Sequence, residues 1–460
     1  MINAELKQRI VEIVGAEYTL DSEMERTLYG YDAYLVISKP DIVVIPENTE
    51  QVAAVVKLAH ENGIPVTARG AATSLTGGPV PLKGGIVVHF GRMNRILDID
   101  VENRTATLEP GVITLDLQTA VAKKGLQYAP DPASQKTSTM GGNLGENAGG
   151  PHCLKYGVTT HHILGVEAVM YDGTVVEIGG PAMENPGIDL LGLIVGSEGT
   201  LCLVTRIIVK LIPQPEAIKT LLAIYNSIED ASNTVSAIIA DGIVPATLEM
   251  MDNIVIQAVE DSIKAGYPRD AAAVLIIELD GLKDGLERLS ARIMDICKAN
   301  NVREVKAAKD DAERMALWAG RKGAFGAISR LRPNYMVCDG TVPRTKLPEV
   351  LQKVLELGRQ YDLKIGNVFH AGDGNLHPLI LFDSRDKEEL ARVEKVGSEI
   401  LKLCAEAGGT ISGEHGIGME KLKEMEFIFS PADIDFMRRL KIAFDPVERY
   451  NPGKVLPQAQ

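Results

Sequence analysis

The chain has 460 residues, 45% of them hydrophobic, and its 48 Lys and Arg against 62 Asp and Glu give a formal net charge of −14. This length exceeds what one compact core supports and predicts two or three domains. Average apolar and charged content excludes a disordered chain, and the acidic balance argues against a general nucleic-acid binder. No uncharged apolar run reaches about 18 residues, so no membrane span is expected.

The N-terminus and the cysteines indicate the compartment. The opening MINAELKQRIVEIVG is an amphipathic helical pattern, which argues against a secretion signal. The five cysteines, at 153, 202, 297, 338 and 404, include no C-x-x-C pair. Neither an iron–sulfur cluster nor a zinc ribbon is therefore expected from them, and their scatter is typical of a reducing cytosol. We expect a cytoplasmic protein.

In the first 213 residues, short apolar strands alternate with amphipathic helices. Apolar spacing predicts helices over 1–30 and 49–62, the second ended by Gly63. Strands are expected over 41–45, 64–68, 85–89, 96–100, 105–108, 166–169 and 205–211, with a hairpin turn at Tyr171-Asp-Gly-Thr.

A boundary is predicted at Ile212-Pro-Gln-Pro215, where the pattern changes to longer units. Strands over 220–226, 272–279 and 335–338 alternate with helices over 229–241, 282–300 and 310–330. Long helices covering one face of an antiparallel sheet make an α+β domain. The expected domains are residues 1–213, residues 214–424, and a C-terminal segment, 425–460, that returns to the first domain.

The first of three glycine-rich stretches follows the strand over 64–68. It reads Ala68-Arg-Gly-Ala-Ala-Thr-Ser-Leu-Thr-Gly-Gly78, and no Asp or Glu occurs from Asn62 through Leu97. Converging backbone N–H groups and hydroxyls suit a pyrophosphate, although a tight turn is the commoner meaning of Gly-Gly. Neither a Rossmann fingerprint nor a P-loop is present. The candidate ligand-binding residues here are Arg69, Gly70, Ala71, Ala72, Thr73, Ser74 and Leu75.

Two further stretches have similar chemistry. The second runs from Pro130-Asp-Pro-Ala-Ser134 to Asn147-Ala-Gly-Gly150, and its glycines permit close approach to a flat ligand whose edge the Asn side chains can bond. The third is Val195-Gly-Ser-Glu-Gly-Thr200. The candidate cofactor-binding residues in these stretches and in the tail are Pro130, Asp131, Ser134, Ser138, Thr139, Gly141, Gly142, Asn143, Asn147, Gly149, Glu198, Gly199, Thr200 and Asn451.

Two C-terminal motifs bring together metal-ligand types. His370-Ala-Gly-Asp-Gly-Asn-Leu-His377 contains a turn that lets its two histidines face each other across a hairpin end, and Ser412-Gly-Glu414-His415-Gly-Ile-Gly418 adds a carboxylate. Two imidazoles and one carboxylate form an open divalent-metal site of catalytic type. The alternative is a set of buried, hydrogen-bonded histidines and a surface glutamate.

Three other polar residues are candidates for catalysis. His415 adjoins a proposed ligand, and the residues alone leave it open between a proton acceptor and a structural histidine that supports a ligand. Arg321 lies on a predicted helix, where most arginines are solvated. Asn375 is first of all a turn-former that can also reach a substrate.

These motifs resemble those of the FAD-linked D-2-hydroxyacid dehydrogenases, which include D-lactate dehydrogenases and glycolate oxidase flavoprotein subunits. The resemblance runs from about Asp41 to Lys454. It implies a vanillyl-alcohol oxidase (PCMH) type FAD-binding domain and a ferredoxin-like α+β cap that holds substrate and metal. It also implies non-covalent FAD, because the first loop has no histidine.

The resemblance assigns roles to the candidates. His370, His377 and Glu414 would bind a divalent metal (Zn, Fe or Mn), His415 would be the base, and Arg321 would hold the substrate carboxylate. Relatives that take larger dicarboxylates have a threonine and a lysine where this chain has Phe325 and Met336. A small D-2-hydroxyacid, D-lactate or glycolate, is therefore expected rather than 2-hydroxyglutarate.

The expected reaction transfers a hydride to flavin N5, and the electrons then need an external acceptor: an electron-transfer flavoprotein, an iron–sulfur subunit or a quinone. A dimer or a complex with further subunits is compatible with this. The alternatives are a D-2-hydroxyglutarate dehydrogenase, a metal-dependent hydrolase, an alkyl-dihydroxyacetone-phosphate synthase and a non-catalytic flavin subunit.

Overall fold

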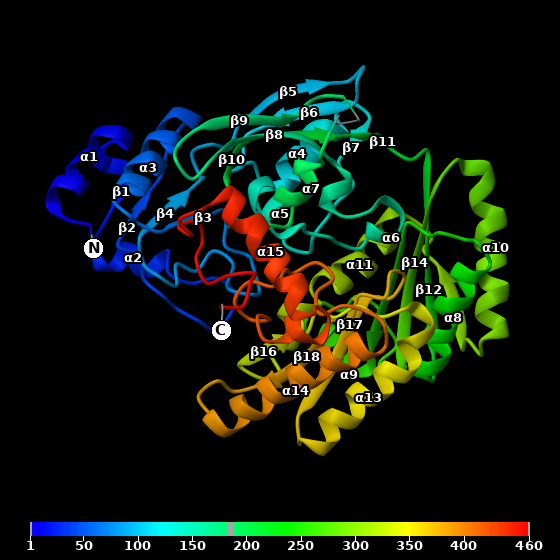
Figure 1. The fold of residues 1–460 in the computed structure, drawn as a ribbon. Coiled ribbons are helices and arrows are strands. Elements are labelled where there is room, and N and C mark those ends of the chain that lie inside the picture. The colour runs from blue at the N-terminus through cyan, green and yellow to red at the C-terminus, as the bar shows by residue number, and fades with distance from the viewer. Residues whose placement is uncertain (1, 183–186, 459–460) are drawn as a thin grey trace. The chain divides into compact units, whose positions relative to one another are not determined.

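Figure 1 shows the protein as a computed structural model that describes residues 2–182 and 187–458. The chain forms two compact units. Unit 1 comprises Met1–Gly149, Gly157–Gln214 and Glu414–Gln460, and unit 2 comprises Gly150–Tyr156 and Pro215–Gly413. The boundary after Gln214 lies one residue from the predicted one. The C-terminal return differs from the prediction, because it begins at Glu414 instead of at 425.

The first sheet of unit 1 has the order β1-β2-β4-β3, in which β2, β4 and β3 are parallel neighbours. Its strands are β1 (Thr19–Leu20), β2 (Ile42–Val44), β3 (Val66–Arg69) and β4 (Ile86–His89), and its helices are α1 (Ala4–Val14), α2 (Glu23–Leu28) and α3 (Thr49–Glu61). Apolar residues of α1, α3 and the strands share one core. The single helix expected over 1–30 is wrong, because Gly15 ends α1 with a φ of 92°, which favours glycine.

The second sheet of unit 1 is antiparallel and has the order β5-β6-β10-β8-β9. Its strands are β5 (Ile96–Asp100), β6 (Thr105–Leu108), β8 (Ile163–Val169), β9 (Val175–Gly179) and β10 (Leu203–Lys210). Helices α4 (Thr114–Ala122), α5 (Met140–Glu146) and α7 (Leu190–Ile194) contribute to its core. The predicted hairpin turn is confirmed, since Met170 N–H donates to the Thr174 carbonyl at 2.8 Å.

Smaller elements complete unit 1. They are the strand pair β7 (Leu126–Gln127) and β11 (Ile212–Pro213), the 3-10 turns η1 (Ala16–Tyr18), η2 (Thr159–His161) and η4 (Glu424–Phe427), and helix α15 (Pro431–Phe444). Ser430 caps α15 by accepting from Asp433 N–H, and the Asp433 carboxylate accepts in return from Ser430.

Unit 2 is built on one seven-stranded sheet of order β15-β12-β14-β13-β17-β18-β16. Every neighbouring pair is antiparallel, as predicted. The strands are β12 (Ala217–Tyr225), β13 (Thr247–Asp252), β14 (Ala273–Gly281), β15 (Glu304–Ala307), β16 (Asn334–Val337), β17 (Lys364–His370) and β18 (Pro378–Phe382).

Helices pack on both faces of this sheet rather than on the single face expected. The helices are α6 (Cys153–Tyr156), α8 (Ile228–Ala240), α9 (Asn253–Ser262), α10 (Lys283–Ala299), α11 (Asp311–Lys322), α12 (Ala324–Ile328), α13 (Leu347–Gln360) and α14 (Lys387–Glu406), with the turn η3 (Arg344–Lys346). Two successive residues of β17 show this. The side chain of Ile365 points toward Gly358 of α13. A Cβ built on Gly366 would point toward α12 and stand 2.7 Å from Ile328. Because successive strand residues point to opposite faces, α13 and α12 lie on different sides.

Three further findings bear on the sequence predictions. The helix expected over 310–330 is interrupted at Gly323, which ends α11 and begins α12. Within the described residues, every helix is too short or too polar to cross a bilayer. No disulfide joins the five cysteines, all of which lie in the described part of the chain.

Candidate functional site

The first glycine-rich loop leaves β3 and packs directly on the second glycine-rich segment. A Cβ on Gly70 would overlap Oγ1 of Thr139, so only glycine permits this approach. Ala72 has a positive φ of 55°, and residues 70–75 are all half-buried. Two of the three predicted loops therefore lie side by side in unit 1, with backbone and hydroxyl groups between them.

The basic residues of the acid-free stretch do not converge on this loop. Arg92 pairs with Glu47 at 2.7 Å, and Arg95 pairs with Glu109 at 2.6 Å, so carboxylates from outside the stretch neutralise both. Arg69 is buried, and its Nη2 donates to the Tyr31 carbonyl at 2.8 Å. Its Nη1 is buried without a hydrogen-bond partner among the described residues, which leaves one donor for a bound anion.

Polar residues of the second segment hold its own backbone. Thr139 caps α5 by accepting from Gly142 N–H, and Asn143 Nδ2 donates to Thr114 Oγ1 at 2.7 Å. Asn147 ends α5 with a φ of 53°, and its Oδ1 accepts from Thr160 N–H at 2.9 Å. Ser138 Oγ also lies 3.1 Å from Thr114 Oγ1. One amide atom of each asparagine is therefore used to hold the protein's own fold.

The third element and the tail are tied to the first loop. Asn451 Nδ2 donates to the carbonyls of Gly78 at 2.9 Å and Glu198 at 2.8 Å. Thr200 Oγ1 donates to the Ser197 carbonyl at 2.7 Å. The structure thus brings the three predicted glycine-rich elements and Asn451 together within unit 1. The carboxylate of Glu198 accepts hydrogen bonds from the backbone N–H groups of Ile417 and Gly418.

The other predicted cofactor residues differ in exposure. Pro130, Asp131 and Gly149 are buried, whereas Ser134, Gly141, Gly142 and Gly199 are half-buried. A Cβ on Gly141 would stand 2.6 Å from Cβ of Pro110, so the backbone there also needs glycine. A backbone-lined cradle with an orphaned arginine donor suits the diphosphate of a dinucleotide.

Gly70 gives a direct test of this cradle. Gly70→Ala is expected to push the first loop away from Thr139 and to lower the FAD retained by the purified protein at least tenfold, because loop contact leaves no room for a methyl group. Flavin absorbance per protein, before and after gel filtration, measures the effect. Gly285→Ala is the matched control, since Gly285, like Gly70, has no positive φ, and a Cβ there would meet nothing within 4 Å. Equal flavin retention in both variants would contradict the close-packed cradle.

In unit 2, the two histidines of the first C-terminal motif meet as predicted. His370 ends β17, and His377 directly precedes β18. Their ring centroids are 5.2 Å apart at an interplanar angle of 81°, and a ring nitrogen of each lies within 4.8 Å of the other. Both side chains are buried. Two such nitrogens at this separation can bind one metal ion.

Glu249, which the sequence analysis missed, holds His370 in place. Glu249 of β13 stands opposite His370 of β17, and the carboxylate lies 2.8 Å from Nδ1 of His370. It also accepts from Nε of Arg321 at 2.7 Å. Burial favours the neutral acid, but His370 and Arg321 outweigh it and hold the pKa of Glu249 below its ordinary value. An ionised Glu249 accepts a hydrogen bond from Nδ1 of His370, which fixes the orientation of the ring.

Asp339 is a second residue missed from sequence. It is fully buried, and Oδ1 lies 3.4 Å from Nε2 of His377. Oδ2 accepts from Ser412 Oγ at 2.7 Å and from Gly413 N–H at 3.1 Å. Asp339 therefore fixes the main chain that leads directly into Glu414.

The predicted site residues Arg321 and Asn375 are both buried in unit 2. Arg321 is 2% exposed and is not a solvated helix arginine. Asn375 packs against Gly413, and its Oδ1 is buried without a hydrogen-bond partner among the described residues. An orphaned acceptor of this kind marks a place where a polar ligand can bind.

Glu414 and His415 begin the last segment of unit 1. His415 Nε2 lies 4.0 Å from Glu414 Oε1, and the His415 carbonyl accepts from Thr76 Oγ1 at 3.3 Å. The residue proposed as base is thus held by the first glycine-rich loop, on the cofactor side of the chain.

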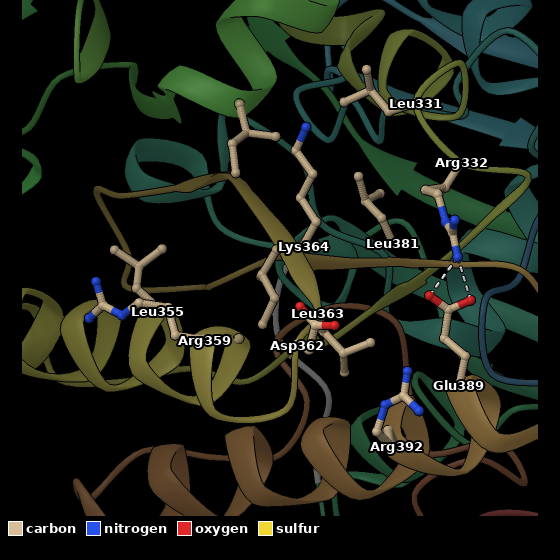
Figure 2. A pocket seen from close by; sticks show the side chains of 13 residues that line it. Leu331, Arg332, Leu355, Arg359, Asp362, Leu363, Lys364, Leu381, Glu389 and Arg392 are labelled. Atoms are coloured by element: carbon tan, nitrogen blue, oxygen red, sulfur yellow. Dashed lines mark hydrogen bonds and ion pairs between the residues drawn. The ribbon is translucent and has the colours of Figure 1, made fainter.

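A separate cavity of unit 2 lies beside α13, β17 and α14 (Figure 2). It has a volume of about 650 Å³ and is lined in part by Arg332, Arg359, Lys364 and Arg392. Arg332 pairs there with Glu389 at 2.6 Å. None of the predicted site residues lines it, so it is not part of the candidate site.

Comparisons with known proteins identify the family of this chain. The family model "FAD binding domain" matches residues 40–179, and the model "FAD linked oxidases, C-terminal domain" matches residues 214–455. The second covers more than half of the chain. The chain belongs to the FAD-linked oxidase family and is an FAD-dependent oxidoreductase.

Three relatives illustrate how similar the chain is to characterised members. Glycolate oxidase subunit GlcD of Escherichia coli K12 is 48% identical over 93% of this chain and 85% of its own. The protein of the same name from Bacillus subtilis is 45% identical over 99% of this chain and 97% of its own. A D-lactate dehydrogenase of Archaeoglobus fulgidus is 36% identical over 90% and 91%.

Solved structures support the fold. p-Cresol methylhydroxylase superposes with a TM-score of 0.84 at 17% identity, covering 98% of this chain and 96% of its own. Alkyldihydroxyacetonephosphate synthase superposes with a TM-score of 0.78 at 19% identity, covering 98% and 86%. The predicted PCMH-type FAD-binding fold is confirmed.

Proposed function

We propose that this protein oxidises a small D-2-hydroxyacid, D-lactate or glycolate, to the 2-oxoacid with FAD and a divalent metal. The observation that carries the proposal is the buried pair His370 and His377, with His370 oriented by Glu249. Relatives named glycolate oxidase subunit and D-lactate dehydrogenase support the substrate class.

His370 Nε2 and His377 would hold the metal, which is Zn, Fe or Mn, and Glu414 would complete the site. Glu414 follows Gly413, whose N–H is fixed by Asp339 beside His377. The buried, oriented imidazoles fit such an ion. When bound, the metal would supply Lewis acidity to the substrate hydroxyl, and FAD would accept the hydride at N5.

The protein's own groups would do the rest. Glu249 contacts Nε and Nη2 of the Arg321 guanidinium and so fixes its orientation, and the donors that Glu249 does not use would bind the substrate carboxylate. Asn375 Oδ1 would accept a hydrogen bond from the substrate, and His415 would take the hydroxyl proton. Fixing the carboxylate in this way orients the carbon that loses hydride.

Phe325 supports a small substrate. Its ring lies 6.3 Å from that of His377 and 6.1 Å from that of Tyr335, so an aromatic wall stands beside the histidine pair. The second carboxylate of a dicarboxylic substrate such as D-2-hydroxyglutarate would find no hydrogen-bond donor on these aromatic rings. Met336 does not contribute to this argument, because its Sδ points at Gly397 of α14. The alternative, D-2-hydroxyglutarate oxidation, would need a cation near Phe325.

We propose that the electrons leave to an external acceptor, an electron-transfer flavoprotein, an iron–sulfur subunit or a quinone. Relatives named as subunits of glycolate oxidase favour a complex with further subunits over a self-contained enzyme. Five cysteines without a disulfide suit a reducing compartment, and we propose a cytoplasmic location.

Anaerobic flavin bleaching tests the function. D-lactate or glycolate is expected to bleach the flavin of metal-loaded protein, and D-2-hydroxyglutarate to bleach it at least tenfold more slowly, because its second carboxylate would face the aromatic ring of Phe325. Stopped-flow absorbance gives the rates. His370→Ala with His377→Ala is expected to abolish bleaching and metal content together. A flavoprotein that no hydroxyacid reduces would instead be a non-catalytic flavin subunit, and a colourless active protein would be a metal-dependent hydrolase.

A further inference from the structure

The turn Gly416–Gly418, which follows His415 directly, is enclosed by two carboxyl groups of unit 1. Glu198 Oε1 accepts from Ile417 N–H at 2.8 Å, and its Oε2 accepts from Gly418 N–H at 2.9 Å. A Cβ on Gly416 would stand 2.5 Å from Oε2 of Glu146 and 2.6 Å from Oε1 of Glu198. Both carboxyl groups therefore close on the same α-carbon.

The rest of the turn is held just as tightly. Met419 N–H donates to the Thr76 carbonyl at 2.9 Å, and a Cβ on Gly418, whose φ is 53°, would overlap that carbonyl. Lys421 Nζ donates to the Gly416 carbonyl at 3.0 Å. The turn is thus fixed by the first glycine-rich loop, by the end of α5 and by the third element, all of which belong to the cofactor side.

The acids around the turn differ in how their carboxyl groups are held. Asp32, Glu146 and Glu198 are three acids, and Arg69, Lys421 and Lys454 are three bases, in one cluster of unit 1, in which Arg69 interacts with Asp32. Burial raises the pKa of Asp32 and of Glu198, but both carboxyl groups accept backbone N–H bonds, which favour their ionised forms and oppose that rise. The three acids therefore differ in the backbone bonds that support them, and not in the number of cations around the cluster.

Glu146 is the acid of this cluster least suited to carry a negative charge. The residue is half-buried, but its Oε2 is inaccessible to solvent and accepts no hydrogen bond from the described residues. Burial, and then repulsion from Glu198, raise the pKa of Glu146 well above its ordinary value. Ser74 and Lys421 favour the ionised form, and Asp32 opposes it.

We propose that a neutral Glu146 and an ionised Glu198 form a clasp on Gly416–Gly418, and that Glu146 is thereby a positioning residue for His415. Two ionised carboxylates would repel each other across the α-carbon of Gly416 and open the turn. The clasp itself does not depend on the reaction. Its effect on turnover rests on the proposed function, in which His415 is the base.

Thermal unfolding of FAD-loaded Glu146→Gln against pH tests the clasp. In the unfolded chain Glu146 ionises near its ordinary pKa, whereas in the folded protein it stays protonated, so wild-type stability falls as pH rises between these two values. Glutamine cannot ionise. The variant is therefore expected to match the wild type at pH 5 and to melt several degrees higher at pH 8, and groups common to both proteins cancel in the difference.

Two outcomes would overturn the clasp: a difference in melting temperature that stays constant from pH 5 to pH 8, or a variant that is less stable at pH 8. Glu198→Gln is the matched control. It removes an ionised acceptor from Ile417 and Gly418, and it is expected to be less stable than the wild type at both pH values.

The positioning role needs a second readout. Glu146→Ala leaves a gap beside Gly416 and is expected to slow flavin reduction by the hydroxyacid at least tenfold, with unchanged flavin content, whereas Glu146→Gln is expected to restore most of the rate. An alanine variant that reduces flavin at the wild-type rate would overturn the positioning role. If no hydroxyacid reduces the wild-type flavin, the proposed function fails, and the melting curves still test the clasp.

Discussion

Replacing His415 by asparagine is expected to slow flavin reduction by about 10²–10⁴-fold, the range that a positioned general base contributes. The carbonyl of His415 is held by Thr76, and the turn after it is held by Glu198, so its backbone cannot move to compensate. Asparagine keeps a polar group there but cannot take the hydroxyl proton. Anaerobic stopped-flow reduction by D-lactate or glycolate measures the rate.

The control is His60→Asn, which changes a histidine at the end of α3 that packs edge-to-face against Tyr171. Its reduction rate is expected to equal that of the wild type, and both variants are expected to retain FAD and metal. A His415→Asn rate within tenfold of the wild type would make His415 a structural histidine, the alternative that the sequence alone leaves open.

The parts of the site that the sequence predicts are those set by local backbone geometry. The glycine-rich loops approach one another at Gly70 because a side chain would not fit, and His370 faces His377 because the intervening turn is encoded within eight residues. Such features depend on neighbours in the chain. The glycine that ends α1, Gly15, was an equally local signal that the expected helix over 1–30 overlooked.

The parts that the sequence does not predict depend on pairing between distant segments. Glu249 reaches His370 because β13 and β17 are neighbours in the sheet. The sequence patterns predict no strand between residues 242 and 271, so this pairing could not be expected. A glutamate in the apolar run Thr247-Leu-Glu-Met-Met251 was the available signal, since a buried charge needs a partner. Likewise, Arg92 and Arg95 are neutralised by Glu47 and Glu109, which lie outside the acid-free stretch.

Replacing Glu249 by glutamine is expected to weaken binding of the divalent metal about 10- to 100-fold, the usual cost of losing a carboxylate that orients a metal-bound histidine. Glutamine has no charge to hold the Nδ1 proton of His370, so the ring no longer presents Nε2 to the metal in one fixed tautomer. Metal content after dialysis against a chelator series gives the affinity without requiring activity.

Glu278→Gln separates this effect from the general cost of removing a buried charge. Glu278 of β14 is 2% exposed against 1% for Glu249, and it lies in the same sheet. Its carboxylate accepts from Thr220 and from Trp318 Nε1 rather than from His370. Both variants are expected to melt at lower temperature, because each leaves buried donors poorly paired. Only Glu249→Gln is expected to lose metal affinity, and an equal loss in both would show that Glu249 acts through stability alone.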